Sequence, residues 1–501
     1  MTAKPEPTVW AAPGKGRWAR NFRLGEWLPD PLTPLFEDWL LPLIETGYLE
    51  GMEQDIGVRV PFRYAAVNGW YYNAPPIPSP RMVAPAIWRS RGRLPWFLFN
   101  VLIRVSRDPA AAHRAVLHGM ELKWRNQLLP EYRQLVSDAE LAVDAATPAG
   151  LVELVESMCR EAGIQLWSLS VVGGSAWKME AALARFWQEH LAGPLRGTQA
   201  GGIGHQALLS GLAIAPPPPA AFAVYSLDWY HPTAGDAGPP SPGSDASGAG
   251  RTAERVAQRI DAGAAARTAL AATPGLLARL DSLVTMAQHY AVVREEQARY
   301  LTLGWPALRR CARRLGEYAA TAGAIDEPDD IHFLTLDEAL HPSADYRALA
   351  AGRRTAWQRQ RGLAAPLVLG EPARFGSDPI AGAVQAARIS HDLPADAIVG
   401  HPASAGRATG PVRVMTGPDD FGSFREGEIL VARSTAPAWT PLFARAAAVV
   451  TDGGSLAAHA SLVAREYGIP AVVGTGDATS RLHTGQRVTV DGGAGFVIPL
   501  S

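Results

Sequence analysis

The 501-residue chain has few cysteines and no excess of charge of either sign. Its two cysteines, Cys159 and Cys311, lie far apart and lack the paired spacing of a zinc site or a disulfide framework, so we expect a cytoplasmic protein without a bound metal. Lysine and arginine total 47, against 48 for aspartate and glutamate. Because this balance provides neither a basic field for nucleic acid nor an acidic field for cationic partners, any ligand must be recognised locally.

Long apolar runs are also missing. The amino-terminal MTAKPEPTVWAAPGKGRWAR lacks the apolar core of a signal peptide, and the most apolar later stretch, LLSGLAIAPPPPAAFAV, is interrupted by four prolines. We therefore expect no signal peptide, no membrane span and no membrane or nucleic-acid partner. Because 501 residues exceed what one hydrophobic core usually supports, we expect more than one domain.

Residues 1–385 are predicted to form a large, mostly α-helical domain. Apolar residues recur at helical spacing in AAAHRAVLHGMELKWRNQLLPEYRQLV and in the long segment that begins LLARLDSLVTMAQHY, which has a glycine stop at Gly323. Most tryptophans lie in the first 230 residues, several of them in stretches rich in proline. They suit either the lining of a ligand pocket or ordinary core packing.

Two segments are predicted to be irregular. Residues 231–252 consist mainly of glycine, proline, serine and alanine, and are therefore interpreted as a flexible insertion. Residues 386–398 belong to a charged, alanine-rich stretch and are interpreted as a hinge linker to the last part of the chain. DDIHFLTLDEAL is predicted to be a short extended piece that leads into a helix.

Residues 399–501 have a different sequence pattern, which predicts a compact β/β/α domain. Short β-branched runs bounded by glycine, proline and aspartate are interpreted as strands wrapped around one helix, SLAAHASLVAREYG. The strand candidates are ATGPVRVM, EGEILVA, AAAVVTD, IPAVVG, QRVTVDG and AGFVIPL.

The stretch TDGGSLAAHASLVAREYGIP is predicted to be a strand, a glycine turn, a helix and a stop at Gly468 and Pro470. Ser455 is the expected helix cap, which places His459 in or just after the first turn. A helix amino terminus disfavours a cationic imidazole and attracts anions, so a phosphoryl group on His459 would be stabilised there. A lone histidine among alanines is, by itself, more often a packed or partly exposed residue than a catalyst.

The same stretch, together with GPVRV and GEILVARSTAPAWTPLF, resembles the swivelling phosphohistidine domain of the phosphoenolpyruvate-utilising enzymes. These include phosphoenolpyruvate synthase, pyruvate phosphate dikinase and the rifampin phosphotransferases. The resemblance implies that His459 carries a phosphoryl group, on Nε2. The expected phosphoryl-binding residues are Thr451, Gly453, Gly454 and Ser455. Where the family usually has serine or threonine immediately before the histidine, this chain has alanine.

A second resemblance lies upstream. YAVVREEQARYLTLGW and the residues that follow it, with EWLPDPLTPLFEDWLLP and VNGWYYN, are similar to the acceptor-binding domain of rifampin phosphotransferases. In those enzymes an arginine, four residues before a lysine, approaches the phosphohistidine. Arg294 matches the arginine, Ala298 stands at the lysine position and Arg299 follows it. The resemblance therefore makes Arg294 and Arg299 catalytic candidates for neutralising the phosphoryl group.

Acid–base candidates for the acceptor hydroxyl are less defined. Glu295, Glu296, His289 and His332 have suitable chemistry, but no spacing selects one of them. A surface or core role is the more common one for such residues.

The phosphoryl donor is expected to lie on another protein. Family members that use ATP carry a nucleotide-binding domain, and this sequence has no GxxxxGK[ST] loop. We therefore expect a separate ATP-grasp-like subunit, with ATP and Mg²⁺ bound there and no cofactor bound tightly by this chain. Split systems such as phenylphosphate synthase provide the analogy.

The expected function is that of a phosphotransferase subunit that delivers a phosphoryl group from His459 to the hydroxyl of a small apolar or aromatic acceptor. The alternative is a non-catalytic phosphocarrier or regulator with a degenerate histidine domain. An apolar pocket that faces His459 would favour the enzyme. A helical domain filled by its tryptophans would favour the regulator.

Overall fold

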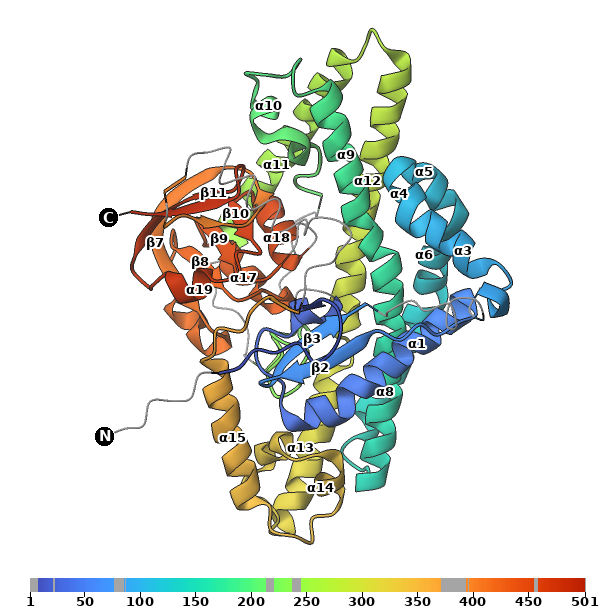
Figure 1. The fold of residues 1–501 in the computed structure, drawn as a ribbon, viewed down its shortest axis with the longest axis vertical. Coiled ribbons are helices and arrows are strands. Elements are labelled where there is room, and N and C mark those ends of the chain that lie inside the picture. Colours follow the sequence, from blue (N-terminus) through green and yellow to red (C-terminus); the bar gives the residue numbers. More distant parts are fainter. Residues whose placement is uncertain are drawn as a thin grey trace.

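The structure is a computed structural model in which a helical domain lies beside a β-rich C-terminal domain (Figure 1). The C-terminal domain, drawn in orange and red, lies on one side of the long helices α9 and α12. The structure describes residues 8–20, 23–75, 85, 87–212, 220–236, 245–370, 393–394, 396–454 and 458–500.

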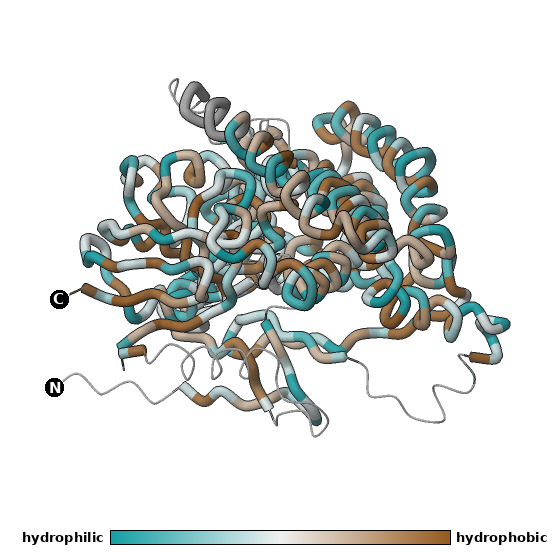
Figure 2. The backbone as a smooth tube through the Cα atoms, turned by 90° about the horizontal axis from the view of Figure 1, so that it is seen from above, coloured by the Kyte–Doolittle hydropathy of each residue, from teal (hydrophilic) through white to brown (hydrophobic). Residues whose placement is uncertain are grey.

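The helical domain is built around long helices with one apolar side. Figure 2 shows hydrophobic and hydrophilic segments alternating along most of them, as expected for amphipathic helices. The α-helices are α1 (Leu41–Ile56), α3 (Arg93–Leu98), α4 (Val105–Arg107), α5 (Pro109–Ala112), α6 (His118–Lys123), α7 (Leu129–Ala142), α8 (Pro148–Val171), α9 (Ala176–His190), α10 (Gln199–Ile203), α11 (Asp245–Ala269), α12 (Pro274–Leu301), α13 (Trp305–Thr321), α14 (Leu336–Leu340) and α15 (Arg347–Arg361).

Shorter 3₁₀ and π-helical segments connect or continue these helices. They are η1 (Arg23–Trp27), η2 (Phe36–Leu40), η3 (Phe99–Arg104), η4 (His113–Leu117), η5 (Trp124–Leu128), η6 (Gly173–Ser175), η7 (Gly204–Leu208) and η8 (Pro328–Phe333). The predicted helical periodicity is thus confirmed, and Gly323, at φ +79°, follows α13 as the predicted stop.

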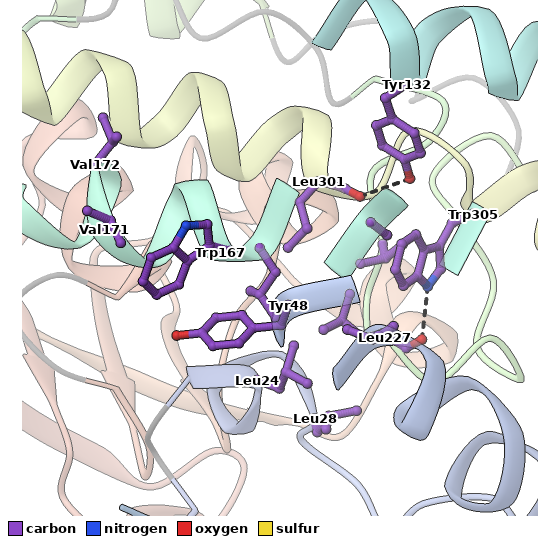
Figure 3. Packing of buried hydrophobic residues seen from close by; sticks show 14 of the residues in the cluster. Leu24, Leu28, Tyr48, Tyr132, Trp167, Val171, Val172, Leu227, Leu301 and Trp305 are labelled. Atoms are coloured by element: carbon purple, nitrogen blue, oxygen red, sulfur yellow. Dashed lines mark hydrogen bonds between the residues drawn. The ribbon is translucent and has the colours of Figure 1, made fainter. Parts of the chain in front are cut away.

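Helices α1 and α8 pack closely because glycines lie at their crossing. A Cβ atom on Gly47 would lie 1.8 Å from the carbonyl oxygen of Arg160, and one on Gly163 would lie 2.2 Å from that of Ile44. Around this pair, large aromatic side chains fill the core (Figure 3). The Trp305 indole donates a hydrogen bond to the Leu227 carbonyl at 2.9 Å. Most tryptophans of the domain are therefore core residues, which follows the packing interpretation of the sequence.

A small antiparallel sheet, which the sequence analysis did not predict, lies within the helical domain. Among the described residues its strand order is β2–β3–β1–β4. Asn68 and Gly69, both at positive φ, make the turn between β2 and β3. An Asn-Gly pair is a typical two-residue hairpin turn, so this hairpin had a signal in the sequence. The strands are β1 (Trp18–Ala19), β2 (Arg63–Val67), β3 (Trp70–Ala74) and β4 (Val368–Leu369).

The C-terminal domain contains an eight-stranded sheet in the order β5–β12–β11–β7–β8–β9–β10–β6 among the described residues. Strands β7 to β10 pair in parallel, and the outer strands pair antiparallel. All six predicted strands are present, and β5 and β6 are additional. The strands are β5 (Ile398–Val399), β6 (His401–Ser404), β7 (Arg407–Met415), β8 (Ile429–Ala432), β9 (Ala448–Thr451), β10 (Ala471–Val473), β11 (Arg487–Asp491) and β12 (Phe496–Pro499).

Helix α18 (His459–Tyr467) connects β9 to β10 and packs on the sheet through Ala460, Val463 and Ala464. It ends at Gly468, which adopts φ +64°, as predicted. The remaining helical segments of this domain are η9 (Pro418–Ser423), η10 (Pro437–Trp439), α17 (Thr440–Phe443) and α19 (Ala478–Arg481).

Three predictions about irregular segments need correction or cannot be placed. Residues 245–252 of the predicted insertion 231–252 belong to α11, and residues 231–236 are anchored by an Arg309–Asp236 ion pair of 3.0 Å. Residues 237–244 lie outside the described residues, as does most of the predicted linker 386–398. DDIHF forms the 3₁₀ segment η8 instead of an extended piece, because Glu327 and Asp330 form a capping box.

Candidate active site between the two domains

His459 lies in the first turn of α18, as predicted, but it is the first residue of the helix, which begins later than a Ser455 cap implied. The residue before it, Ala458, is the N-cap and contributes no side-chain hydrogen bond. Gly454 turns the chain between β9 and α18 at φ +106°, where a Cβ atom would lie 3.2 Å from that of Ala458. The helix cap is thus Ala458 and not Ser455, which lies outside the described residues.

The His459 imidazole is enclosed at the domain interface. Its Nε2 is buried and has no hydrogen-bond partner among the described residues, and its ring meets the edge of Phe443 at 6.0 Å between centroids. Burial lowers the pKa of His459 to about 3, and the neighbouring Arg294 cation acts in the same direction. The imidazole is therefore neutral at physiological pH. A lone pair on one ring nitrogen is then available for bond formation.

Two charged residues of α12 face this imidazole. Glu295 Oε2 lies 4.0 Å from His459 Nδ1, and Arg294 Nη1 donates to Glu295 Oε1 at 2.8 Å. Burial raises the pKa of the Glu295 carboxyl, and Arg294 opposes that rise. A carboxylate beside Nδ1 favours the tautomer with its proton on Nδ1, which leaves the lone pair on Nε2.

A cavity of about 390 Å³ adjoins His459. Arg294 and Arg299 both line it, and Arg299 Nε is buried without a hydrogen-bond partner in the described part of the chain. The structure therefore brings both predicted arginines to one cavity with His459. Their roles remain predictions. The rest of the lining is mainly apolar and aromatic, and it includes Ala176, Trp177, Leu209, Leu212, Ala287, Ala291, Val292, Tyr300, Leu462, Val463 and Tyr467.

A smaller gap of about 20 Å³ lies on the glycine-turn side of His459. Of the predicted phosphoryl-binding residues, Thr451, Gly453 and Gly454 line it. The Thr451 hydroxyl donates to the Gly453 carbonyl at 2.6 Å, and the Gly453 amide donates to the Arg433 carbonyl at 2.7 Å. Both donors are thus engaged within the domain in this conformation, and their phosphoryl-binding role remains a prediction.

Sequence reasoning missed Thr435, which also lines the smaller gap. Its Oγ1 is buried and has no hydrogen-bond partner among the described residues. A buried hydroxyl without a partner is unfavourable unless a ligand supplies one. The motif GEILVARSTAPAWTPLF contains this residue, but nothing in the motif alone places its hydroxyl beside His459.

Polar contacts hold the C-terminal domain against the helical domain. Arg465 of α18 forms a buried ion pair of 2.8 Å with Glu180 of α9. Arg433 pairs with Asp30 at the same distance on the other side of the site. Because both contacts cross the domain boundary, any swing of the C-terminal domain must break them.

The other acid–base candidates divide into two groups. Glu296 lines the large cavity together with Glu295. His332 is buried against Trp229, and burial lowers the pKa of His332 to about 3. His289 Nε2 lies 2.7 Å from Glu121 Oε2. Neither histidine lines the cavity. Within the described residues, no group of three or more metal-binding side chains is present.

Residues 424–495 match the family model described as PEP-utilising enzyme, mobile domain. The chain is 35% identical over 236 residues to an uncharacterised phosphotransferase, YvkC, of Bacillus subtilis, a match that covers 46% of this chain and 28% of that protein. It is 36% identical over 186 residues to the rifampicin phosphotransferase of Bacillus subtilis, a match that covers 36% of this chain and 20% of that protein. It is 35% identical to the rifampicin phosphotransferase of Streptomyces sviceus, a match that covers 37% of this chain and 21% of that protein.

The chain thus spans between a fifth and 28% of the length of these relatives. The family match includes His459, the glycine turn, Thr435 and the strands from β8 to β11. Residues 424–495 thus match the mobile domain of the phosphoenolpyruvate-utilising enzymes, which confirms the resemblance predicted for this part of the chain.

Proposed function

We propose that this chain is a phosphotransferase that carries a phosphoryl group on His459 Nε2 and transfers it to a hydroxyl of a small acceptor in the interdomain cavity. The observation that supports this most directly is the buried, neutral imidazole on the wall of a mainly apolar cavity. The relatives named as phosphotransferases support the same chemistry.

In the first step Nε2 attacks the phosphorus of the donor. A P–N bond forms, the P–O bond to the leaving phosphate group breaks and its electron pair remains on that oxygen. We propose ATP as the donor, bound with Mg²⁺ by a separate ATP-binding subunit. In the conformation described here Nε2 is buried, so this step requires the C-terminal domain to swing away from α12.

In the second step the acceptor oxygen attacks the phosphorus. The P–N bond breaks, its electron pair returns to Nε2, and the hydroxyl proton passes to the Glu295 carboxylate. A raised pKa makes Glu295 a better proton acceptor near neutral pH than an ordinary carboxylate. Arg294 and Arg299 would neutralise the charge on the transferring group.

The lining of the cavity supports an apolar or aromatic acceptor. Trp177, Tyr300 and Tyr467 offer aromatic surfaces, and Arg294 and Glu295 lie near His459. Such a site buries the body of a ligand and orients its hydroxyl at the charged end. A phenol or a comparable hydroxylated ring suits this division.

The alternative, a non-catalytic phosphocarrier, finds less support. It predicted a helical domain filled by its tryptophans, but about 390 Å³ remains open beside His459. Ala458 still favours it, because the hydroxyl usual before the histidine is missing. Thr435 offers a replacement from a neighbouring loop.

The test uses phosphoramidate, a small reagent that phosphorylates histidine without a partner protein. The expected result is an acid-labile mass increase of one phosphoryl group in the wild type and none in His459→Ala. Incubation of the labelled chain with a panel of phenols should then release the label as a phosphate monoester. A label that also forms on His459→Ala, or one that no hydroxylated acceptor removes, would count against the proposal.

A second experiment addresses the donor. The chain is incubated with γ-labelled and β-labelled ATP, alone and with candidate ATP-binding proteins. Label on His459 that requires both proteins supports the split arrangement, and label with this chain alone contradicts it.

A further inference from the structure

The helix formed by α3 and η3 is apolar on its outer side as well as on its inner side. Phe97, Val101 and Val105 are buried against the domain core. The opposite side, with the turn that precedes it, forms what we call the outer patch. Its members and exposed fractions are Ile87 43%, Trp88 83%, Trp96 52%, Leu98 41%, Phe99 46%, Leu102 55% and Ile103 45%.

The outer patch is one continuous side of the helix. Trp96, Phe99 and Ile103 follow one another at intervals of three and four residues, and Leu98 and Leu102 are four apart, so all five share a side. Surface helices normally present polar residues to water on that side. A helix that is apolar all round is covered on both sides in its working state.

The charged residues within the segment that carries the outer patch, which we call its rim, are all basic. No aspartate or glutamate occurs from Ile56 to Arg107. The described arginines beside the patch have no ion pair with an acidic residue in the described part of the chain, and all except Arg104 are exposed; they are Arg89, Arg91, Arg93, Arg104 and Arg107. Such a rim repels a basic partner and attracts an anionic one.

The phosphotransfer site does not use this surface. None of its residues lines the interdomain cavity. Figure 1 places α3 on the far side of α12 from the C-terminal domain, so the patch stays accessible while that domain is docked. Its exposure therefore needs an explanation separate from the chemistry at His459.

We propose that the outer patch docks the chain on an anionic membrane surface, with the apolar side chains at the boundary of the acyl chains and the arginines on the lipid phosphates. Amphipathic interfacial helices combine these two features, and tryptophan is favoured at that depth. An anionic lipid surface offers acyl chains for the apolar side chains of the outer patch and negative phosphates for the arginines of its rim. Such a helix lies on the surface, since no described helix is long and apolar enough to cross a bilayer.

This inference departs from the expectation that the chain has no membrane partner. That expectation rested on spanning segments and signal peptides, and a short interfacial helix is neither of them. The composition of the whole chain also hid it, because 47 basic and 48 acidic residues balance overall while the segment from Ile56 to Arg107 does not.

The test is flotation of the full chain with vesicles of phosphatidylcholine containing about one third phosphatidylglycerol, and with vesicles of phosphatidylcholine alone. The wild type should float with the anionic vesicles, and added salt should weaken that binding. The double variant Phe99→Glu and Leu102→Glu should bind at least about tenfold more weakly, because two apolar side chains lose their burial. Leu141→Glu is the matched control, since Leu141 is 83% exposed on α7 and should leave binding unchanged.

A charge variant separates the two parts of the proposal. Arg89→Glu with Arg91→Glu should remove the preference for anionic over neutral vesicles. The proposal is overturned if the wild type does not float with anionic vesicles, or if the patch variant floats as well as the wild type. It is also overturned if the patch instead mediates a dimer, seen by light scattering as a monomer only in the double variant. Labelling of His459 by phosphoramidate should be the same in all these variants, so failure here is distinct from failure of the proposed function.

Discussion

Arg465 of α18 and Glu180 of α9 form a buried ion pair of 2.8 Å that crosses the boundary between the two domains. Both side chains are at least nine-tenths buried. His205 lies 3.5 Å from the other oxygen of the same carboxylate. Burial alone would raise the pKa of Glu180, but Arg465 and His205 lower it overall, so the carboxylate stays charged.

Replacing Glu180 with glutamine should weaken docking of the C-terminal domain. Loss of the carboxylate breaks this buried ion pair, which costs about 3 kcal/mol. Small-angle X-ray scattering should therefore show a larger radius of gyration for Glu180→Gln than for the wild type. Glu53→Gln, which breaks an exposed pair with Arg59, is the control and should leave the scattering unchanged.

Docking should also weaken on acidification because of His459. Its pKa is lowered to about 3 in the docked state, against about 6.5 when exposed, so the docked state binds fewer protons. The stability that neutral His459 contributes is complete above pH about 6.5 and declines progressively as pH falls toward about 3. Scattering between pH 7 and pH 4 should show opening in the wild type and less opening in His459→Asn. Equal pH profiles for the two proteins would contradict this assignment.

Thr435→Val tests the unpartnered hydroxyl that lines the same gap as His459. Since Oγ1 has no partner in the described structure, valine should leave the melting temperature unchanged or slightly raised. Transfer of the phosphoryl group from His459 should slow about tenfold, because one hydrogen bond to the charged group is lost. The rate is measured as loss of acid-labile label in the presence of acceptor. Thr416→Val, whose hydroxyl binds Asp420 on the surface, is the control in the same domain.

Arg299→Gln should affect the second step and not the first. Its guanidinium lines the cavity, so its removal should lower the rate of transfer to the acceptor by a factor of about 100. Phosphorylation by phosphoramidate should keep its wild-type rate, since that step occurs with the domain open. Arg313→Gln, on the exposed side of α13, is the matched control. If both steps slow equally, Arg299 acts on the fold and not on transfer.

The sequence predicted the parts of this molecule that local patterns determine. Glycine turns and β-branched runs located the strands of the C-terminal domain, and Gly468 located the end of α18. The match of Arg294 to a known motif located one wall of the cavity. The family match itself followed from residues that are close together in the chain.

The features that the sequence did not predict have a common physical cause, because they depend on residues far apart in the sequence. Thr435 and His459 line the same gap only when β8 and β9 are side by side, and Glu180 meets Arg465 only when the domains dock. Strands β1 and β4 of the small sheet are two residues each, too short for any alternation to show. The β2–β3 hairpin is different, because its Asn-Gly turn is a local signal that the sequence does contain.

The gap of about 20 Å³ that His459 lines limits where a phosphoryl group can lie when the two domains are docked. It admits a water molecule and is too small for a phosphoryl group. Under the proposed function, a phosphoryl group on docked His459 must therefore occupy the cavity of about 390 Å³, which His459 also lines. By thermodynamic reciprocity, an acceptor bound in that cavity and a phosphoryl group that occupies it change each other's affinity by the same factor. Docking of the phosphorylated domain and binding of the acceptor are then coupled through one shared space.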